Sequence, residues 1–158
     1  MNVTLPVPSL GTAQAPTIGD IVSFRFPFPS IEECRSRVPR PCLVIDSEDY
    51  LGGFFLEILP GTQSLLPERE PSDLAIDPTA LFPEHQHLGA WRFIAAYHDR
   101  FDIAHPGFAV SDAGGPLRLG RAYGSTRDAL DHLRGQLQAT REEHIAKRRA
   151  RRAARRKL

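Results

Sequence analysis

The stretch RPCLVID, from Arg40 to Asp46, decides the fold class of this chain. Its apolar run from Cys42 to Ile45 is β-prone and typical of a core strand. Pro41 has no N–H for a sheet ladder, so we expect it at the first position of this strand. Arg40 then lies at the edge of a sheet, and the proline that follows restricts its backbone. The sequence therefore predicts a fixed cation at the mouth of a buried strand.

Further strands are predicted on both sides of this stretch. Upstream, Val22, Phe24 and Phe26 alternate with polar residues, which indicates a half-buried strand. Downstream, Gly52-Gly53 predicts a hairpin turn into FFLEIL, residues 54–59, a third strand that we expect Pro60-Gly61 to close.

The second half of the chain predicts shorter elements and one helix. The helix is expected to begin with Ser125 as its cap and Asp128 at the capping-box position. Its apolar stripe consists of Leu130, Leu133 and Leu137, and the residues after Leu137 have no apolar partner in the pattern. The other expected elements are an edge strand in DLAID (73–77), one or two helical turns within 79–87, a fourth strand in WRFIAAYH (91–98), its continuation or a fifth strand in RFDIA (100–104), and a short last strand in LRLGRAYG (117–124).

Short strands followed by one helix predict a mainly β protein, a small antiparallel barrel with a C-terminal helix. We expect a disordered segment over residues 1–16, a barrel domain with its helix over 17–140, and a basic tail over 141–158. No stretch approaches the ~18 consecutive apolar residues that a membrane span requires. The N-terminus lacks the charged start and apolar core of a secretory signal, so a cytoplasmic location is expected.

Charge is unevenly distributed along the chain, although the net charge is only +1. From Arg141 onward there are nine Lys/Arg and two Glu, whereas the preceding 140 residues carry 11 Lys/Arg and 17 Asp/Glu. Such asymmetry indicates either a basic arm with affinity for polyanions or a solvated helical tail. The tail contains no aromatic residue that could stack on nucleic-acid bases.

Cysteine and histidine usage predicts neither a disulfide nor a metal site. Cys34 and Cys42 are expected to be free thiols, with Cys42 a small buried hydrophobe. His85 and His87 flank Gln86 without a third ligand nearby, so no metal and no cofactor are expected.

Three landmarks occur in order within residues 18–64: Gly19-Asp20-Ile21-Val22, Arg40-Pro41 and Pro60-Gly61-Thr62. Their order and strand context resemble the MazF/PemK (Kid) toxins of bacterial toxin–antitoxin modules. The resemblance implies an SH3-like barrel of the type shared with CcdB, usually a homodimer. It implies metal-independent cleavage of single-stranded RNA, and an antitoxin partner that occupies the RNA groove.

The same resemblance assigns roles to individual residues. Arg40 would stabilise the charged phosphorane formed when the 2′-OH attacks, because its planar guanidinium binds two phosphate oxygens and stays charged. Thr62 stands where the family places a threonine that holds phosphate. Arg35, Arg37 and Gln63 are the expected RNA contacts. Structural roles remain open, since Arg40 can instead cap the barrel mouth through carbonyls or Glu57, and Thr62 can be a plain turn residue.

The general base departs from the family pattern. Many family loops carry a glutamate a few residues before the arginine, whereas Glu32 and Glu33 lie eight and seven residues before Arg40. Kid-like members use a carboxylate on a later strand, a part that Asp99 or Asp102 could play. His98 is the nearby group that titrates near neutrality. The sequence leaves these five candidates open.

A non-catalytic function is the alternative. The same barrel could serve as a CcdB-like poison or as an RNA-binding relic, or the basic tail could be the main nucleic-acid contact. CcdB-like poisons act through an aromatic residue near the C-terminus, and this chain has none after Tyr123.

Overall fold

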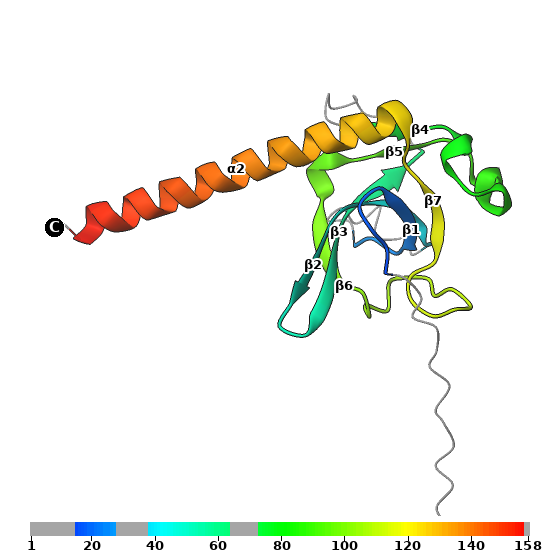
Figure 1. The fold of residues 1–158 in the computed structure, drawn as a ribbon, viewed down its shortest axis with the longest axis horizontal. Helices are drawn as coiled ribbons and strands as arrows, with labels where there is room; N and C mark the ends of the chain where they lie inside the picture. Colours follow the sequence, from blue (N-terminus) through cyan, green and yellow to red (C-terminus); the bar gives the residue numbers. More distant parts are fainter. Residues whose placement is uncertain (1–14, 28–37, 64–72, 157–158) are drawn as a thin grey trace, which may run out of the picture.

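The computed structural model describes residues 15–27, 38–63 and 73–156. These residues form one curled antiparallel sheet of seven strands, a half-barrel, with a long C-terminal helix across it (Figure 1). The predicted mainly β architecture with a terminal helix is thus confirmed. The strands are β1 (Asp20–Phe24), β2 (Arg40–Tyr50), β3 (Gly53–Thr62), β4 (Leu74–Ile76), β5 (Trp91–Phe93), β6 (Asp99–Asp102) and β7 (Arg118–Arg121); the helices are η1 (Pro78–Ala80), η2 (Pro83–Leu88), η3 (Ala95–Tyr97) and α2 (Gly124–Arg156).

The hairpin of β2 and β3 is the centre of the sheet. Its two-residue turn has positive φ at both central residues, 48° at Leu51 and 80° at Gly52, the pattern of a type I′ turn. The hairpin predicted from the glycine pair is therefore confirmed. The strand order is β4-β5-β3-β2-β1-β7, and β6 also pairs with β3. Pro41 is the second residue of β2 rather than the first, because Arg40 already pairs with Phe24 of β1.

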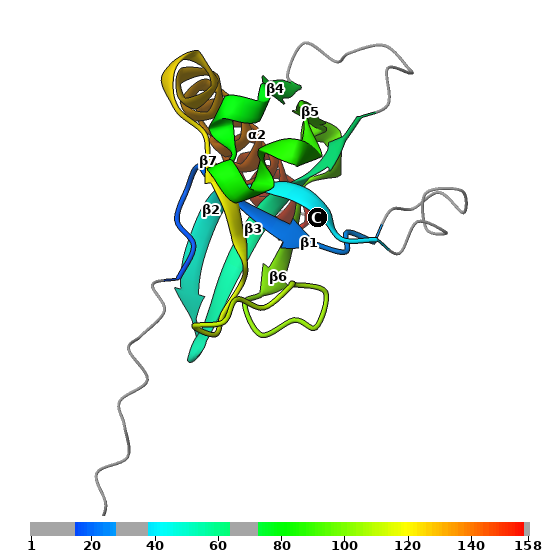
Figure 2. The same cartoon turned by 90° about the vertical axis from the view of Figure 1, so that its right-hand side faces the viewer.

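The far edge of β3 binds two short strands in succession. β6 pairs with residues 55–58 of β3, and β5 pairs with Gly61 and Thr62. The predicted closure of β3 at Pro60-Gly61 is wrong, since the Pro60 carbonyl accepts a hydrogen bond from Ile94 N (3.0 Å) and the strand runs to Thr62. The predicted strand over 91–98 is also too long, because it ends at Phe93 and continues as the 3-10 turn η3. β4 and β5 lie near α2, at the end of the sheet remote from β6 (Figure 2).

Strand β1 is buried along its whole length, so its prediction as a half-buried strand is wrong. Apolar groups cover both faces of the sheet at this point. Ile21 belongs to the core beneath α2, whereas Val22 and Phe24 belong to a second core. The rings of Phe101 and Phe108 lie 4.5 and 4.4 Å from that of Phe24 and cover this second face. Alternate residues of β1 therefore point to opposite faces of the sheet, and each face belongs to a different core.

The Gly19-Asp20 pair has a structural role. Asp20 is 2 % exposed, and its carboxylate accepts hydrogen bonds from Thr17 N (2.8 Å) and Arg121 Nη1 (2.7 Å). Arg118 Nε lies 3.5 Å from the same carboxylate. Asp20 therefore joins the start of β1 to β7, since a buried carboxylate requires charged or N–H partners.

Helix α2 begins at Gly124, so Ser125 lies in its first turn and is not the predicted cap. Leu130 and Leu133 are buried in the core, and Leu137 packs against it from the edge, as their spacing predicts. The helix then continues without a break past residue 140, the predicted domain boundary, to Arg156. None of the helices in the described ranges contains an apolar stretch of membrane-spanning length.

Candidate functional site

The start of β2 and the end of β3 bring two of the predicted site residues together. Arg40, the first residue of β2, is half-buried, and its Nη1 donates a hydrogen bond to the Gly61 carbonyl (3.3 Å). The register pairs Cys42 with Pro60, and two further residues would place Arg40 opposite Thr62. Side chains alternate along strands, so Arg40 and Thr62 lie on the same face as Cys42 and Pro60. We call this edge of the sheet the rim.

Gly61 allows the two strands to approach closely at the rim. A Cβ on Gly61 would lie 2.4 Å from the Pro41 carbonyl oxygen and 3.1 Å from the Trp91 ring. Real Cβ atoms do not approach backbone oxygen so closely, so any larger residue would push β2 and β3 apart. Because Gly61 has no side chain, β3 can approach β2 closely enough for its carbonyl to accept the hydrogen bond from Arg40.

A second arginine lies across β3 from Arg40. Arg92 of β5 pairs with Thr62 in the register, so the two side chains share a face. Arg92 forms an ion pair with Asp73, whose side chain is 2 % exposed and also accepts a hydrogen bond from Ala95 N (3.1 Å). Thr62 thus stands between two arginines, and a nearby carboxylate compensates the charge of Arg92.

Of the remaining predicted RNA contacts, Gln63 is the one that the structure describes. Gln63 follows β3, and its amide nitrogen donates to the carbonyls of Leu88 (2.7 Å) and Ala90 (3.2 Å). An RNA contact through this amide would compete with those two hydrogen bonds. Arg35 and Arg37, together with the candidate bases Glu32 and Glu33, lie outside the described residues.

The three described candidates for the general base are not gathered around Arg40. Asp99 pairs with Ile58 and Asp102 with Phe55, four and seven residues before Thr62. At about 3.3 Å per residue, these positions are roughly 13 and 23 Å along β3 from Thr62. Asp99 and Asp102 also accept hydrogen bonds from the nearby amides of Arg100 (2.7 Å) and Ala104 (2.8 Å), so both carboxylates already have local partners.

His98 belongs to a different cluster, on the face of the sheet toward α2. Its Nδ1 lies 3.0 Å from Oε1 of Glu57, a carboxylate only 4 % exposed. Arg141 of α2 binds the same carboxylate, with its Nη2 2.6 Å from Oε2 and also bonded to Oε1. We call Glu57, His98 and Arg141 the Glu57 cluster. The sequence left Glu57 open as a structural partner for Arg40, but in the folded chain the two residues lie on opposite faces of the β2–β3 hairpin.

One signal in the sequence could have indicated this cluster. Glu57 is the single charged residue in the apolar strand FFLEIL, and a carboxylate in a core strand requires charged partners. The pattern could not name those partners, because Arg141 is 84 residues away in the chain.

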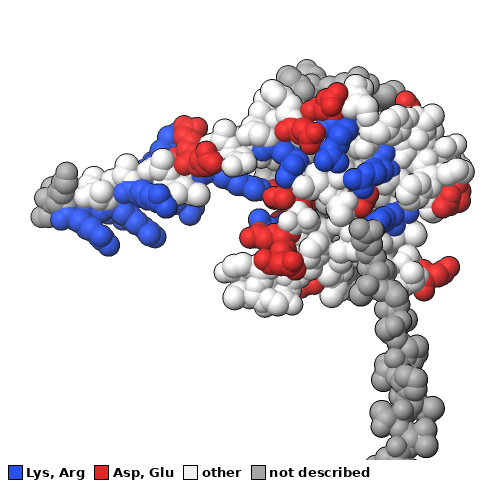
Figure 3. Space-filling model, viewed as in Figure 1, with Lys and Arg blue, Asp and Glu red and all other residues white. Residues whose placement is uncertain are grey.

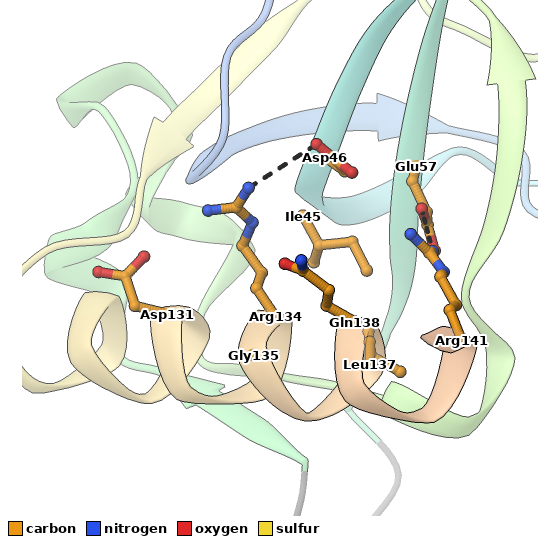
Figure 4. A pocket seen from close by; sticks show the side chains of 9 residues that line it. All are labelled: Ile45, Asp46, Glu57, Asp131, Arg134, Gly135, Leu137, Gln138 and Arg141. Carbon is orange, nitrogen blue, oxygen red and sulfur yellow. Dashed lines mark hydrogen bonds and ion pairs between the residues drawn. The ribbon is translucent and has the colours of Figure 1, made fainter. Parts of the chain in front are cut away.

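A pocket of about 420 Å³ lies beside the Glu57 cluster, between the β2–β3 hairpin and α2 (Figure 4). Arg134 points across it toward Asp46, with Nη2 3.8 Å from Oδ1. The charged groups in its wall are of both signs, and Figure 4 shows two ion pairs across the sheet–helix junction, Arg134–Asp46 and Arg141–Glu57. The lining residues are Ile45, Asp46, Glu57, Asp131, Arg134, Gly135, Leu137, Gln138 and Arg141.

Nucleophilic chemistry at Cys42 is disfavoured by its environment. The thiol is completely buried on β2, and burial raises its pKa to about 12, although the Gly61 backbone and the Arg40 charge oppose this rise. The predicted buried hydrophobe is thus confirmed for Cys42, whereas Cys34 lies outside the described residues. No group of three or more His, Cys, Asp or Glu side chains suited to a metal ion occurs in residues 15–27, 38–63 and 73–156.

No family model matches the chain, and no curated protein is significantly similar to it. Its function therefore has to be inferred from the rim and from the charges around it.

Proposed function

We propose that the protein is an endoribonuclease of the MazF/PemK type that cleaves single-stranded RNA without a metal ion. The observation that carries the proposal is the hydrogen bond from Arg40 Nη1 to the Gly61 carbonyl, which orients a guanidinium at the rim beside Thr62. The curled antiparallel half-barrel with a terminal helix is compatible with the SH3-like barrel of that family. A homodimer and an antitoxin that covers the rim are parts of the same proposal.

The proposed reaction uses the 2′-OH of the RNA as its nucleophile. A base removes the 2′-OH proton, the oxygen attacks the adjacent phosphorus and a phosphorane forms. The bond from phosphorus to the 5′-oxygen of the next nucleotide then breaks, that oxygen takes a proton from solvent, and a 2′,3′-cyclic phosphate remains. Arg40 stabilises the extra negative charge on the phosphorane, because a preorganised cation acts most strongly where charge develops. Thr62 donates one hydrogen bond to the phosphate and supplies no base, since a hydroxyl is not basic enough.

We assign the general base to Glu32 or Glu33. The described candidates fit less well, because Asp99 and Asp102 pair with β3 well before Thr62 and His98 binds Glu57 on the other face. Glu32 and Glu33 belong to the segment that leads directly into Arg40. A carboxylate there can accept the 2′-OH proton, provided that it reaches hydrogen-bond distance in the RNA complex.

A non-catalytic RNA-binding barrel is the second candidate. The favouring observation is that none of the three described base candidates, Asp99, Asp102 and His98, lies beside Arg40. An arginine and a threonine can hold a phosphate without a base, whereas turnover requires one.

The two candidates are separated by incubating the purified protein with a long unstructured RNA in excess EDTA and mapping the ends. The proposal expects cuts that persist in EDTA and leave 2′,3′-cyclic phosphate or 3′-phosphate ends. A strict requirement for Mg²⁺, or 3′-hydroxyl ends, would refute the mechanism. RNA binding without any cut would favour the second candidate.

A further inference from the structure

Beyond the barrel, helix α2 continues as an arm, residues 142–156, with every side chain exposed. At 1.5 Å per residue the arm is about 22 Å long. It projects away from the sheet, and Lys and Arg side chains gather along it (Figures 1 and 3). The only large apolar side chain in the arm is Ile145, which is 50 % exposed.

Arginines recur every seven residues along α2, at 127, 134, 141, 148 and 155. A seven-residue spacing rotates a straight helix by only about 20°, so these residues follow one side of it. The first three attach the helix to the barrel: Arg127 donates to the Ile18 carbonyl (2.8 Å), Arg134 faces Asp46 and Arg141 binds Glu57. The row of arginines that meets the barrel therefore continues along the same side of the helix into the arm, as Arg148 and Arg155.

The last turns of the arm carry arginine on one face. At 100° per residue, its six arginines cover about 160° of the helix circumference, and alanines occupy the opposite side. Among the described residues, none of the six forms an ion pair, whereas Lys147 binds Glu143 within the arm (2.6 Å). The six are Arg148, Arg149, Arg151, Arg152, Arg155 and Arg156, and the alanines are Ala146, Ala150, Ala153 and Ala154.

The composition of this face selects the class of partner. A helix that inserts into a membrane surface, or into a protein groove, requires a row of large apolar side chains. The arm offers alanine there, with Ile145 as its single large apolar group. Base stacking requires aromatic side chains, which the arm lacks. Arginine in place of lysine favours paired hydrogen bonds to phosphate oxygens.

We propose that the arm binds the phosphate backbone of RNA, independently of sequence, and holds the strand next to the barrel. The choice of RNA over other nucleic acids rests on the proposed function. Arginines four residues apart, such as Arg148 and Arg152, repel each other and weaken an isolated helix by about 0.2–0.5 kcal/mol per pair. Bound phosphates remove this repulsion, so the arm gains helicity when RNA binds.

The test measures binding of a fluorescent 20-nucleotide unstructured RNA by anisotropy, from 50 to 300 mM KCl. The full-length chain carries Arg40→Ala throughout, so that cleavage does not disturb the measurement. The arm variant is Arg148→Gln/Arg152→Gln/Arg155→Gln, and the matched control replaces the same three residues by lysine. Each phosphate contact adds about 0.7 to the slope of log K against log salt for single strands.

We expect the slope of log K against log salt to be smaller in magnitude by about 2 for the glutamine variant and unchanged for the lysine control. RNAs of unrelated sequence should give the same loss, and circular dichroism should show that RNA increases the helicity of the parent more than that of the glutamine variant. A glutamine variant with the parental slope would overturn the proposal. So would retention of wild-type affinity for RNA together with lost affinity for anionic phosphatidylserine vesicles, which would assign the arm to a membrane surface.

Cleavage by the chain with Arg40 intact is scored separately. Lost slope without any cleavage refutes the proposed function and leaves the arm inference standing. Cleavage together with an unchanged slope supports the proposed function and refutes the arm inference.

Discussion

Arg141 of α2 binds both carboxylate oxygens of Glu57 on β3, and its Nη2 lies 2.6 Å from Oε2. His98 Nδ1 contacts the same carboxylate at 3.0 Å. A carboxylate that is 4 % exposed would cost several kcal/mol without such partners. The first residue of the predicted basic tail therefore makes a structural contact with the barrel, which the end of the apolar stripe at Leu137 did not indicate.

Arg141→Ala should lower the free energy of unfolding by about 1–2 kcal/mol, measured by urea denaturation at pH 7. Breaking a fully buried pair costs about 3–5 kcal/mol, but Arg141 is half-exposed and His98 still contacts Glu57. Arg149→Ala, on the exposed arm, is the control and should change stability by less than about 0.5 kcal/mol. Equal stability of both variants and the parent would show that solvent already compensates Glu57.

Truncation should show that Arg141, the first residue of the basic tail, contributes to stability and that the arm, residues 142–156, does not. A chain that ends at residue 145 keeps Arg141 and should keep the melting temperature of the full chain. A chain that ends at residue 139 loses the Glu57 contact and should melt several degrees lower, since about 1 kcal/mol corresponds to about 2–8 °C for domains of this size range. Both melting temperatures are read by circular dichroism. A large loss already at 145 would mean that the arm itself packs on the barrel or on a second subunit.

Arg40→Ala should reduce RNA cleavage by about 10²–10³-fold in kcat, because it removes a preorganised donor from the developing charge. Arg40→Lys keeps the charge but loses the planar fork, so it should recover only part of the rate. The control is Arg100→Ala, which removes an arginine from an exposed pair with Glu48 and should leave cleavage unchanged. If Arg40→Ala cleaves RNA as fast as the parent, the Gly61 contact marks a purely structural residue.

Cys42 should be unreactive in the folded protein. With its pKa raised to about 12 by burial, about one thiol in ten thousand is ionised at pH 8. In a Cys34→Ser chain, an aromatic disulfide reagent should therefore label Cys42 only as the protein unfolds. Rapid labelling without denaturant would show that β2 opens locally.

The raised pKa of Cys42 also makes the stability of the protein depend on pH. Unfolded Cys42 ionises near pH 9.0, whereas the folded thiol keeps its proton up to about pH 12. The folded state then binds more protons, so this contribution to stability is complete below pH 9 and declines by about 1.4 kcal/mol per pH unit above it. The difference from a Cys42→Ala chain isolates the effect.

Two glycine substitutions should act in opposite directions. Gly61→Ala should destabilise the protein by about 1–3 kcal/mol, because its Cβ would meet the Pro41 carbonyl. Gly135→Ala should stabilise it by up to about 1 kcal/mol, because this helical position has open space around it. Urea denaturation of both variants tests this pair. A neutral Gly61→Ala would show that the strands at the rim can separate without cost.

Local sequence patterns determined most of the strands and the helix. Alternation and turn residues predicted the β2–β3 hairpin, the edge strand β4 and the buried face of α2, because hydrophobic period and turn chemistry act between neighbours in the chain. Element ends were predicted less well, as at Phe93 and Ser125, because hydrogen bonds from other strands and turns decide where a strand or helix stops.

Contacts between distant residues were decided only by the tertiary structure. Burial of both faces of β1 depends on the segments that later cover it, so its alternating pattern alone indicated a solvent face. Glu57 and Arg141 meet across 84 residues, and neither position shows its partner locally. The sequence by itself predicted that Arg40 lies at the mouth of a buried strand, whereas the approach of β2 to β3 at Gly61 determined where its guanidinium is held. Charge partners and strand spacing are properties of the folded sheet, and for that reason no local pattern encodes them.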